Sequence, residues 1–203
     1  RGLPLPEQQI QMASAGQPIT IGTFTVTFLV SDHVPQSEWI DKATGMNEVV
    51  SEPLATPAWI HEWKEGESWT VLIEHAAGTI LLQGSAGFRE GQLTGYEADL
   101  ALLSSVGLFR QSDEFQQAYF RNTASATDAD TVIPIHWDDF FAPLEGQSTP
   151  PLPWLIEHMN ASFSALQQAA LEENRTFVVV RPGERFYFGN GEAVQAAEAV
   201  DSN

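Results

Sequence analysis

The sequence has no cysteine, few basic residues and no long apolar run. Without cysteine, disulfide bonds, Cys-ligated zinc sites and iron–sulfur clusters are excluded. The 9 Lys and Arg residues stand against 27 Asp and Glu residues, which gives a formal net charge of −18. Such a surface repels a phosphate backbone and anionic lipid, so we expect no nucleic-acid partner and no docking on anionic membranes.

Several targeting and ligand-binding motifs are also missing. No segment reaches the roughly 18 apolar residues of a membrane span, so stable membrane insertion is not expected. No signal peptide follows Arg1, and neither a P-loop, a G-x-G-x-x-G loop nor a G-x-S-x-G turn occurs. The compartment therefore stays open, and cytoplasmic, periplasmic and secreted locations all fit a soluble protein.

The apolar residues that are present follow an alternation of strand and helix patterns. The 203 residues, 43% of them hydrophobic, suffice for one domain with a sizeable core. The patterns predict strands around Gly22 (19–33), a hairpin (68–88), strands at 99–104 and 130–137, helices at 112–125 and 151–174, and a hairpin at 175–189. The segment 34–66 reads as a long irregular loop rich in tryptophan.

The order of these elements predicts the architecture. Hairpins imply antiparallel pairing, and the strand–helix–strand units imply parallel pairing. We therefore expect an α/β fold with a mixed sheet and helices packed on it. The expected organisation is an irregular arm (1–18), one folded unit (19–189) and a flexible tail (190–203).

Two histidines follow apolar strands directly. His33 ends "LVSDH" and His136 ends "TVIPIH", and ligands of α/β sheets bind at such strand ends. Imidazole is a zinc ligand, and the neighbouring carboxylates of Asp32, Asp138 and Asp139 could fix its tautomer. The alternative is that each histidine is a partly buried polar residue without a ligand.

The other histidines and the turn "QGSAGF" support weaker hypotheses. His75 is expected in a solvent-facing turn, His158 in the core or an interface, and His61 in the aromatic loop with Trp39, Trp59 and Trp63. Ser85 lies between two glycines and could contact a ligand, although plain turn chemistry explains it equally well.

The segments "TFTVTFLVSDHVP", "SWTVLIEHAAGTILLQGSAGF", "ADLALLSSVGL" and "TVIPIHWDDFFAPL" resemble, in order and spacing, the second half of metallo-β-lactamase-fold hydrolases. The resemblance covers about residues 19–145, and the branch it suggests contains lactonase-like and N-acyl-phosphatidylethanolamine phospholipase D-like enzymes. It implies the C-terminal portion of a four-layer αββα sandwich. It also implies zinc, or another divalent metal such as manganese or iron.

The resemblance assigns roles to three residues: His33 and His136 match metal ligands, and Ser85 stands where the family often has a bridging aspartate, which makes it a candidate catalytic residue near the metal. Asp138, or alternatively Asp32, would support the ligands, and Asp138 is the second candidate catalytic residue. The implied activity is hydrolysis of a lactone, ester or phosphodiester in a small-molecule substrate by a metal-activated water.

The family's H-x-H-x-D-H motif is missing from the sequence. Only 32 residues precede His33, so the resemblance implies that the chain is the C-terminal part of a longer protein. The expected partner is the N-terminal half, as a separate chain or segment. The alternative function is a non-catalytic remnant or binding module of the same fold that lacks a complete metal site.

Overall fold

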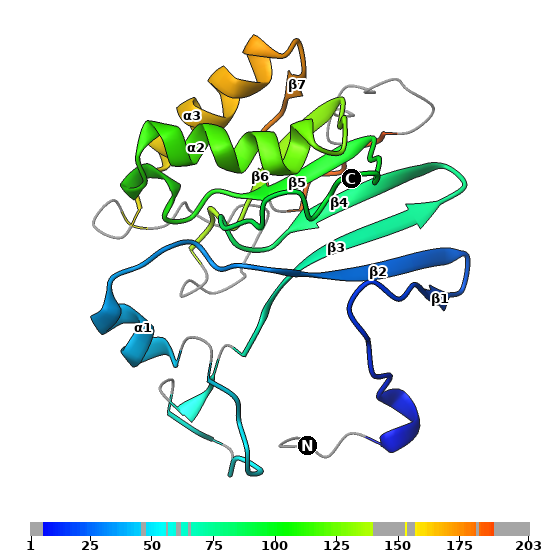
Figure 1. The fold of residues 1–203 in the computed structure, drawn as a ribbon, viewed down its shortest axis with the longest axis vertical. Coiled ribbons are helices and arrows are strands. Elements are labelled where there is room, and N and C mark those ends of the chain that lie inside the picture. Colours follow the sequence, from blue (N-terminus) through cyan, green and yellow to red (C-terminus); the bar gives the residue numbers. More distant parts are fainter. Residues whose placement is uncertain are drawn as a thin grey trace, which may run out of the picture.

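The computed structural model describes residues 6–45, 48–55, 57–59, 62–64, 66–139, 153, 157–181 and 183–188 (Figure 1). The strands are β1 Ile19–Ile21, β2 Phe24–Ser31, β3 Ser68–His75, β4 Gly78–Gln83, β5 Leu100–Ser104, β6 Thr131–Ile135 and β7 Thr176–Phe177. The α-helices are α1 Glu38–Thr44, α2 Asp113–Phe120 and α3 Met159–Glu172. Short turns are η1 Glu7–Gln9, η3 Leu108–Arg110 and the π-helical η4 Arg121–Ser125.

The seven strands form one mixed sheet whose spatial order, β1 to β7, is the order along the chain. Strands β1 to β4 pair antiparallel, and β4 to β7 pair parallel. The predicted mixed sheet is therefore confirmed. Because β3 is antiparallel to both neighbours, β2 runs in the same direction as β4, β5 and β6. The carboxyl ends of these four strands consequently lie at one edge of the sheet, which we call the carboxyl edge.

Helices α2 and α3 lie together on one face of the sheet (Figure 1). The hydroxyl of Ser112 caps α2 by accepting the N–H of Phe115. Alternate strand residues point toward the two helices and form a continuous buried core with them. Its large members are Leu29, Leu72, Leu81, Leu103, Tyr119, Phe120 and Leu166.

The opposite face of the sheet is also apolar, but it is less completely covered. The intervening strand residues point there, and most of them keep intermediate exposure. They include Val26, Phe28, Val71, Ile73, Ile80, Leu82 and Leu102. Among the described residues, the stretch around Val180 to Phe188 lies against β5 and β6 on this side. We refer to this surface as the open face.

Helix α3 begins at Met159, so the prediction of a helix from residue 151 is wrong at its start for the described positions 153, 157 and 158. The cause is the side chain of Glu157, which is 1% exposed. It accepts hydrogen bonds from the Gly107 N–H at 2.8 Å and from the Ser162 hydroxyl at 2.6 Å. The chain enters the helix only after this buried anchor. Residues 151, 152 and 154–156 lie outside the described part.

The predicted hairpin at 175–189 is also wrong, because the strand described in this range is the two-residue β7, which pairs parallel with β6. The Val178 N–H donates to the Val132 carbonyl at 3.0 Å. The next donor on this side of β6 belongs to position 134, and Pro134 has no N–H, so the ladder stops there. The predicted turn includes Pro182, which lies outside the described residues.

Two further points concern the other helices. The segment 34–66, predicted to be irregular, contains the short helix α1, which ends at Gly45 with a φ of 64°. A glycine tolerates this left-handed conformation without steric cost. None of the described helices is long and apolar enough to cross a lipid bilayer.

Candidate functional site

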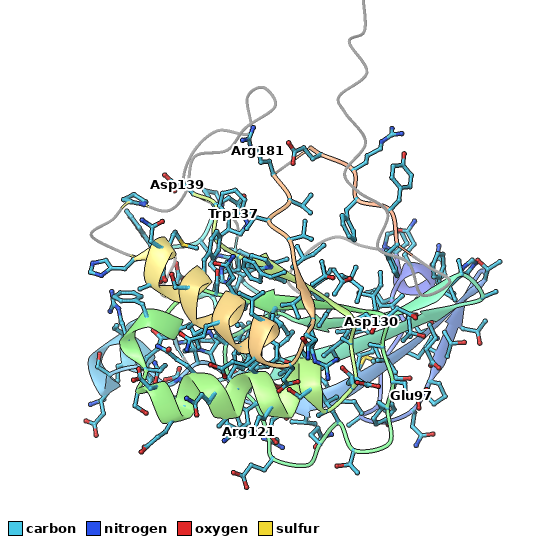
Figure 2. The ribbon with its side chains drawn as sticks, turned by 90° about the horizontal axis from the view of Figure 1, so that it is seen from above. Glu97, Arg121, Asp130, Trp137, Asp139 and Arg181 are labelled. Atoms are coloured by element: carbon cyan, nitrogen blue, oxygen red, sulfur yellow. The ribbon has the colours of Figure 1, made fainter. Side chains whose placement is uncertain are left out.

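The carboxyl edge collects the polar residues that follow four strands. β2 leads into Asp32 and His33, β4 into Ser85, β5 ends at Ser104, and β6 leads into His136. Figure 2 shows Trp137 and Asp139, which follow β6, on the side of the molecule away from Arg121. The strand directions therefore place both predicted metal ligands at the same edge of the sheet.

Residues 32–36 turn across this edge, and we call them the crossing segment. The Val34 N–H donates to Ser85 Oγ at 2.9 Å, and Gln111 Nε2 donates to the Pro35 carbonyl at 2.9 Å. Gln111 follows η3, the turn after β5. The segment thus passes from the end of β2 over the end of β4 toward β5, which carries His33 in the direction of β6.

Gly87 is the tightest contact beneath the crossing segment. A Cβ atom at this position would lie 2.2 Å from the carbonyl oxygen of Asp32 and 2.4 Å from that of His33. Real Cβ atoms do not approach backbone atoms this closely, so only glycine lets the two backbones meet here. The turn after β4 therefore determines where His33 lies.

The described contacts of His33 are made by its Nδ1 atom. Nδ1 lies 3.1 Å from the Val34 carbonyl oxygen and 3.0 Å from Gln36 Nε2. A carbonyl accepts only, so the contact with Val34 requires a proton on Nδ1 and leaves the lone pair on Nε2. The contact with an amide N–H requires the opposite tautomer. A metal bound through Nε2 would select the first arrangement.

His136 has an unusual backbone conformation, with a φ of 61°. Left-handed geometry costs a non-glycine residue about 1–3 kcal/mol and persists where the surroundings impose it. Here the Ile135 carbonyl accepts both the N–H and the hydroxyl of Ser105 at 3.1 and 3.2 Å, and His136 Nδ1 lies 3.4 Å from Ser104 Oγ. Such strain at a candidate ligand is typical of functional positions.

The electrostatics of His136 place it near the other predicted residues. Desolvation lowers the pKa of His136 most strongly, although the residue is exposed at the rim of the sheet. The charge of Asp138 acts in the opposite direction, and the charge of His33 lowers the pKa further. His33 and His136 are therefore close enough to influence each other, while Asp138 stands near enough to support the protonated form.

We expect the imidazole of His136 to titrate below about 6.5, the ordinary histidine value. Because folding lowers this pKa, the unfolded chain binds the proton more readily, and the protein should lose stability as the pH falls below about 6.5. Titration by NMR should show a higher pKa for His136 in a His33→Gln variant, which removes the like charge, and a lower one in Asp138→Asn. His75→Gln is the control, since His75 ends β3 at the opposite edge. An unchanged His136 pKa in His33→Gln would mean that the two imidazoles are not neighbours.

The other predicted site residues have contacts of their own. Ser85 accepts the Val34 N–H, so its described role is structural, and a chemical role stays a prediction. Asp32 forms an ion pair with Arg89, at 2.9 Å between Oδ1 and Nε. Both partners are about half exposed, so the pair adds little stability. Asp138 lines a cavity beside His136, and its catalytic role stays a prediction as well.

Two cavities border the two histidines. A polar cavity of about 460 Å³ adjoins His33 and includes Asp41, Glu67 and Arg89 in its wall. A more apolar cavity of about 350 Å³ adjoins His136 and Trp137 on the open face. Both volumes lie within the range of small-molecule sites. From the loop 34–66, Pro35, Gln36, Asp41 and Val49 contribute to the wall of the first cavity.

Trp59, Trp63, His75 and His158 are not among the residues that line the two cavities. Trp59 and Trp63 are 76% and 44% exposed, so they do not cover a core edge in the described structure. His75 accepts the Ala77 N–H at 3.1 Å in its turn, and His158 stacks on Phe109 with ring centroids 4.5 Å apart. These contacts agree with the structural roles predicted for both. His61 lies outside the described residues, as does the tail at 190–203.

The described residues contain no group of three or more His, Asp or Glu side chains arranged to hold a metal ion. A catalytic zinc takes three protein ligands besides water. His33 and His136 supply suitable imidazoles, but two ligands do not complete such a site.

The sequence did not predict the residues that hold the crossing segment and the turn beneath it in place. Gln83, Gly87 and Gln111 touch the crossing segment or the turn beneath it, yet none forms a recognisable motif. The available signal was Gly87, because "GSAG" places two glycines beside a buried strand. The two glycines indicated that another segment approaches the backbone of this turn closely, but they did not identify that segment.

Comparison with known proteins finds similarity to solved structures but no match at the level of sequence. No protein-family model matches the chain, and no curated protein matches it either. Among solved structures, the chain is similar to the metallo-β-lactamase fold protein YhfI from Bacillus subtilis, with 14% sequence identity and a TM-score of 0.46. The match covers 84% of this chain and 52% of that protein. The chain thus spans about half of the length of the protein it matches.

Proposed function

We propose that this chain supplies two ligands, His33 and His136, to the active site of a metal-dependent hydrolase. The observation that supports this most is that both residues follow strands that end at the carboxyl edge, with His33 near enough for its charge to lower the pKa of His136. A metal ion needs a neutral imidazole, so the lowered pKa of His136 suits a metal ligand. The left-handed backbone of His136 supports the same conclusion.

The reaction we propose is hydrolysis of a lactone, an ester or a phosphodiester. Bound zinc, manganese or iron would lower the pKa of a water ligand to about 7 and so provide the attacking hydroxide. Asp138, whose charge favours protonated His136, would orient that imidazole. The cavity beside His33 would receive the small-molecule substrate.

The missing ligands would come from an N-terminal half that carries H-x-H-x-D-H, either as a separate chain or as a segment of the same polypeptide. The open face supports this proposal. A sheet in a globular protein buries its apolar faces, and here alternate residues of β2 to β5 keep intermediate exposure on the side away from α2 and α3. A second layer packed on this face would end at the carboxyl edge, beside the two histidines.

The test is to isolate the protein from its own cells through a tag on this chain and to measure composition and metal together. We expect a polypeptide segment with H-x-H-x-D-H and a stoichiometric divalent metal. In a His136→Gly variant we expect the same polypeptide and loss of the metal. Glycine accepts the φ of 61°, so the variant should fold at least as well as wild type. A protein of unchanged composition that retains full metal content in His136→Gly would refute the proposal.

A second candidate function is a binding module of the same fold without catalysis. The observations that favour it are the two-ligand donor set and the structural hydrogen bond of Ser85. It predicts that the intact protein contains no stoichiometric metal and that replacing either histidine changes nothing beyond stability. The metal measurement above therefore separates the two functions.

A further inference from the structure

We propose that Gln83 is the positioning residue that places His33 at the metal site, acting through the turn after β4. This inference rests on the proposed function for its consequence, but its structural basis is independent of any metal. Gln83 is the last residue of β4 and is 1% exposed, and no sequence motif includes it. A fully buried amide of this size is stable only when its polar atoms are hydrogen-bonded.

The amide of Gln83 faces four polar groups. Its Nε2 atom lies 3.0 Å from the Ser85 carbonyl oxygen, 2.7 Å from that of Gly87 and 3.0 Å from Ser31 Oγ. The Thr70 hydroxyl donates to its Oε1 atom. Carbonyl oxygens only accept, so the NH2 group must be the one that faces the turn, and the orientation of the amide is determined.

These contacts join three parts of the site at one side chain. Ser31 is the last residue of β2, directly before the crossing segment. Ser85 and Gly87 belong to the turn beneath that segment, which receives the Val34 N–H on Ser85 Oγ and meets the backbone of Asp32 and His33 at Gly87. The Gln83 amide therefore contacts both the turn that lies beneath the crossing segment and Ser31, the residue directly before that segment.

The two ends of the amide have different consequences, and this distinguishes positioning from general stability. Thr70 lies within β3, and its described side-chain hydrogen bond goes to Gln83 Oε1, so its hydroxyl stabilises the buried amide from the end that faces away from the turn. The Nε2 end contacts the turn itself. If Gln83 had only a structural role, losing the contacts of its Nε2 atom and losing the contact of its Oε1 atom would have the same effect on the crossing segment and on His33.

The experiment compares Gln83→Met with Thr70→Val in the full chain. Both variants keep side-chain volume and leave buried hydrogen-bonding groups unsatisfied, so both should lower the unfolding free energy by about 1–3 kcal/mol. Amide hydrogen exchange then reports on the site. In Gln83→Met we expect the Val34 amide to exchange at least about tenfold faster relative to the amides of β3 and β4, because its acceptor Ser85 is released. In Thr70→Val that ratio should stay as in wild type.

Zinc affinity is the second measurement. We expect Gln83→Met to weaken binding of zinc by about tenfold or more, as for other residues that orient metal ligands, and Thr70→Val to leave it unchanged. If Gln83→Met does not fold, Gln83→Asn takes its place, since it keeps the amide but withdraws it by one methylene. Equal effects of Gln83 and Thr70 variants on the Val34 amide would overturn the positioning role. A different outcome is that neither the wild-type chain nor its complex binds zinc, while the Val34 amide still exchanges faster in Gln83→Met than in Thr70→Val. This outcome would refute the proposed function and leave the positioning of His33 intact.

Discussion

A Gly87→Ala variant should lose about 3 kcal/mol of unfolding free energy, and in the proposed complex with the N-terminal half it should lose most of the zinc affinity. The added methyl group would lie 2.2 Å from the Asp32 carbonyl oxygen and 2.4 Å from that of His33, and both contacts are with backbone atoms. Backbone cannot rotate away as a side chain can, so the crossing segment must move outward. That movement breaks the hydrogen bond from Val34 to Ser85 and displaces the imidazole of His33.

Gly84→Ala is the matched control in the same turn. No atom lies within 4 Å of a Cβ built at Gly84, and the residue is exposed. The unfolding free energy of the Gly84→Ala variant should stay within about 0.5 kcal/mol of the wild-type value, and the zinc affinity of this variant should not change. Urea denaturation and zinc titration of both variants provide the comparison. A Gly87→Ala variant as stable as Gly84→Ala would contradict the close approach of the two backbones.

A Glu157→Leu variant should lose about 3 kcal/mol or more of unfolding free energy. The side chain is 1% exposed, and its two oxygens accept the Gly107 N–H and the Ser162 hydroxyl. Leucine fills a similar space but leaves two buried donors without an acceptor, each at a cost of about 1–3 kcal/mol. Gly107 also packs against Val34, since a Cβ there would lie 3.3 Å from the Val34 side chain. The loss should therefore loosen the crossing segment as well.

The control for this prediction is Glu172→Leu at the other end of α3. Glu172 is exposed and accepts a hydrogen bond from Gln168 at 3.0 Å. An exposed pair of this kind contributes little, so the change should remain within about 0.5 kcal/mol in the same denaturation measurement. If the two variants were equally stable, the buried anchor at Glu157 would have no energetic significance.

The sequence predicted the strands well because their signal is local. In β2 and β3, every second residue from Phe24 to Val30 and from Trp69 to Ile73 is apolar, and one face of the sheet follows directly from that period. Both histidines at strand ends were found for the same reason. The direction of the strands, which brings those ends to one edge, followed from the mixture of hairpins and crossovers.

The errors arose where a tertiary contact overrides the local pattern. Residue 158 fits a helical apolar stripe, yet the neighbouring Glu157 turns inward to reach Gly107, about 50 positions away in the chain. The predicted hairpin failed because one proline in β6 removes a donor from a ladder that pairs with a distant strand. The support of His33 by Gln83 and Gly87 could not be predicted for a related reason, since Gln83 contacts Ser31 and Gly87 meets the backbone of Asp32 and His33, and both contacts join segments more than 45 residues apart.

The lengths of the outermost strands have a consequence for the behaviour of the protein at high concentration. β1 has three residues and β7 has two, and these are the strands at the two ends of the sheet order. An unpaired strand offers its N–H and C=O groups to other molecules, and a long one templates aggregation. Here each border offers only a few such groups, and the net charge of −18 makes copies repel each other. The protein should therefore resist edge-to-edge association even while one broad apolar face remains incompletely covered.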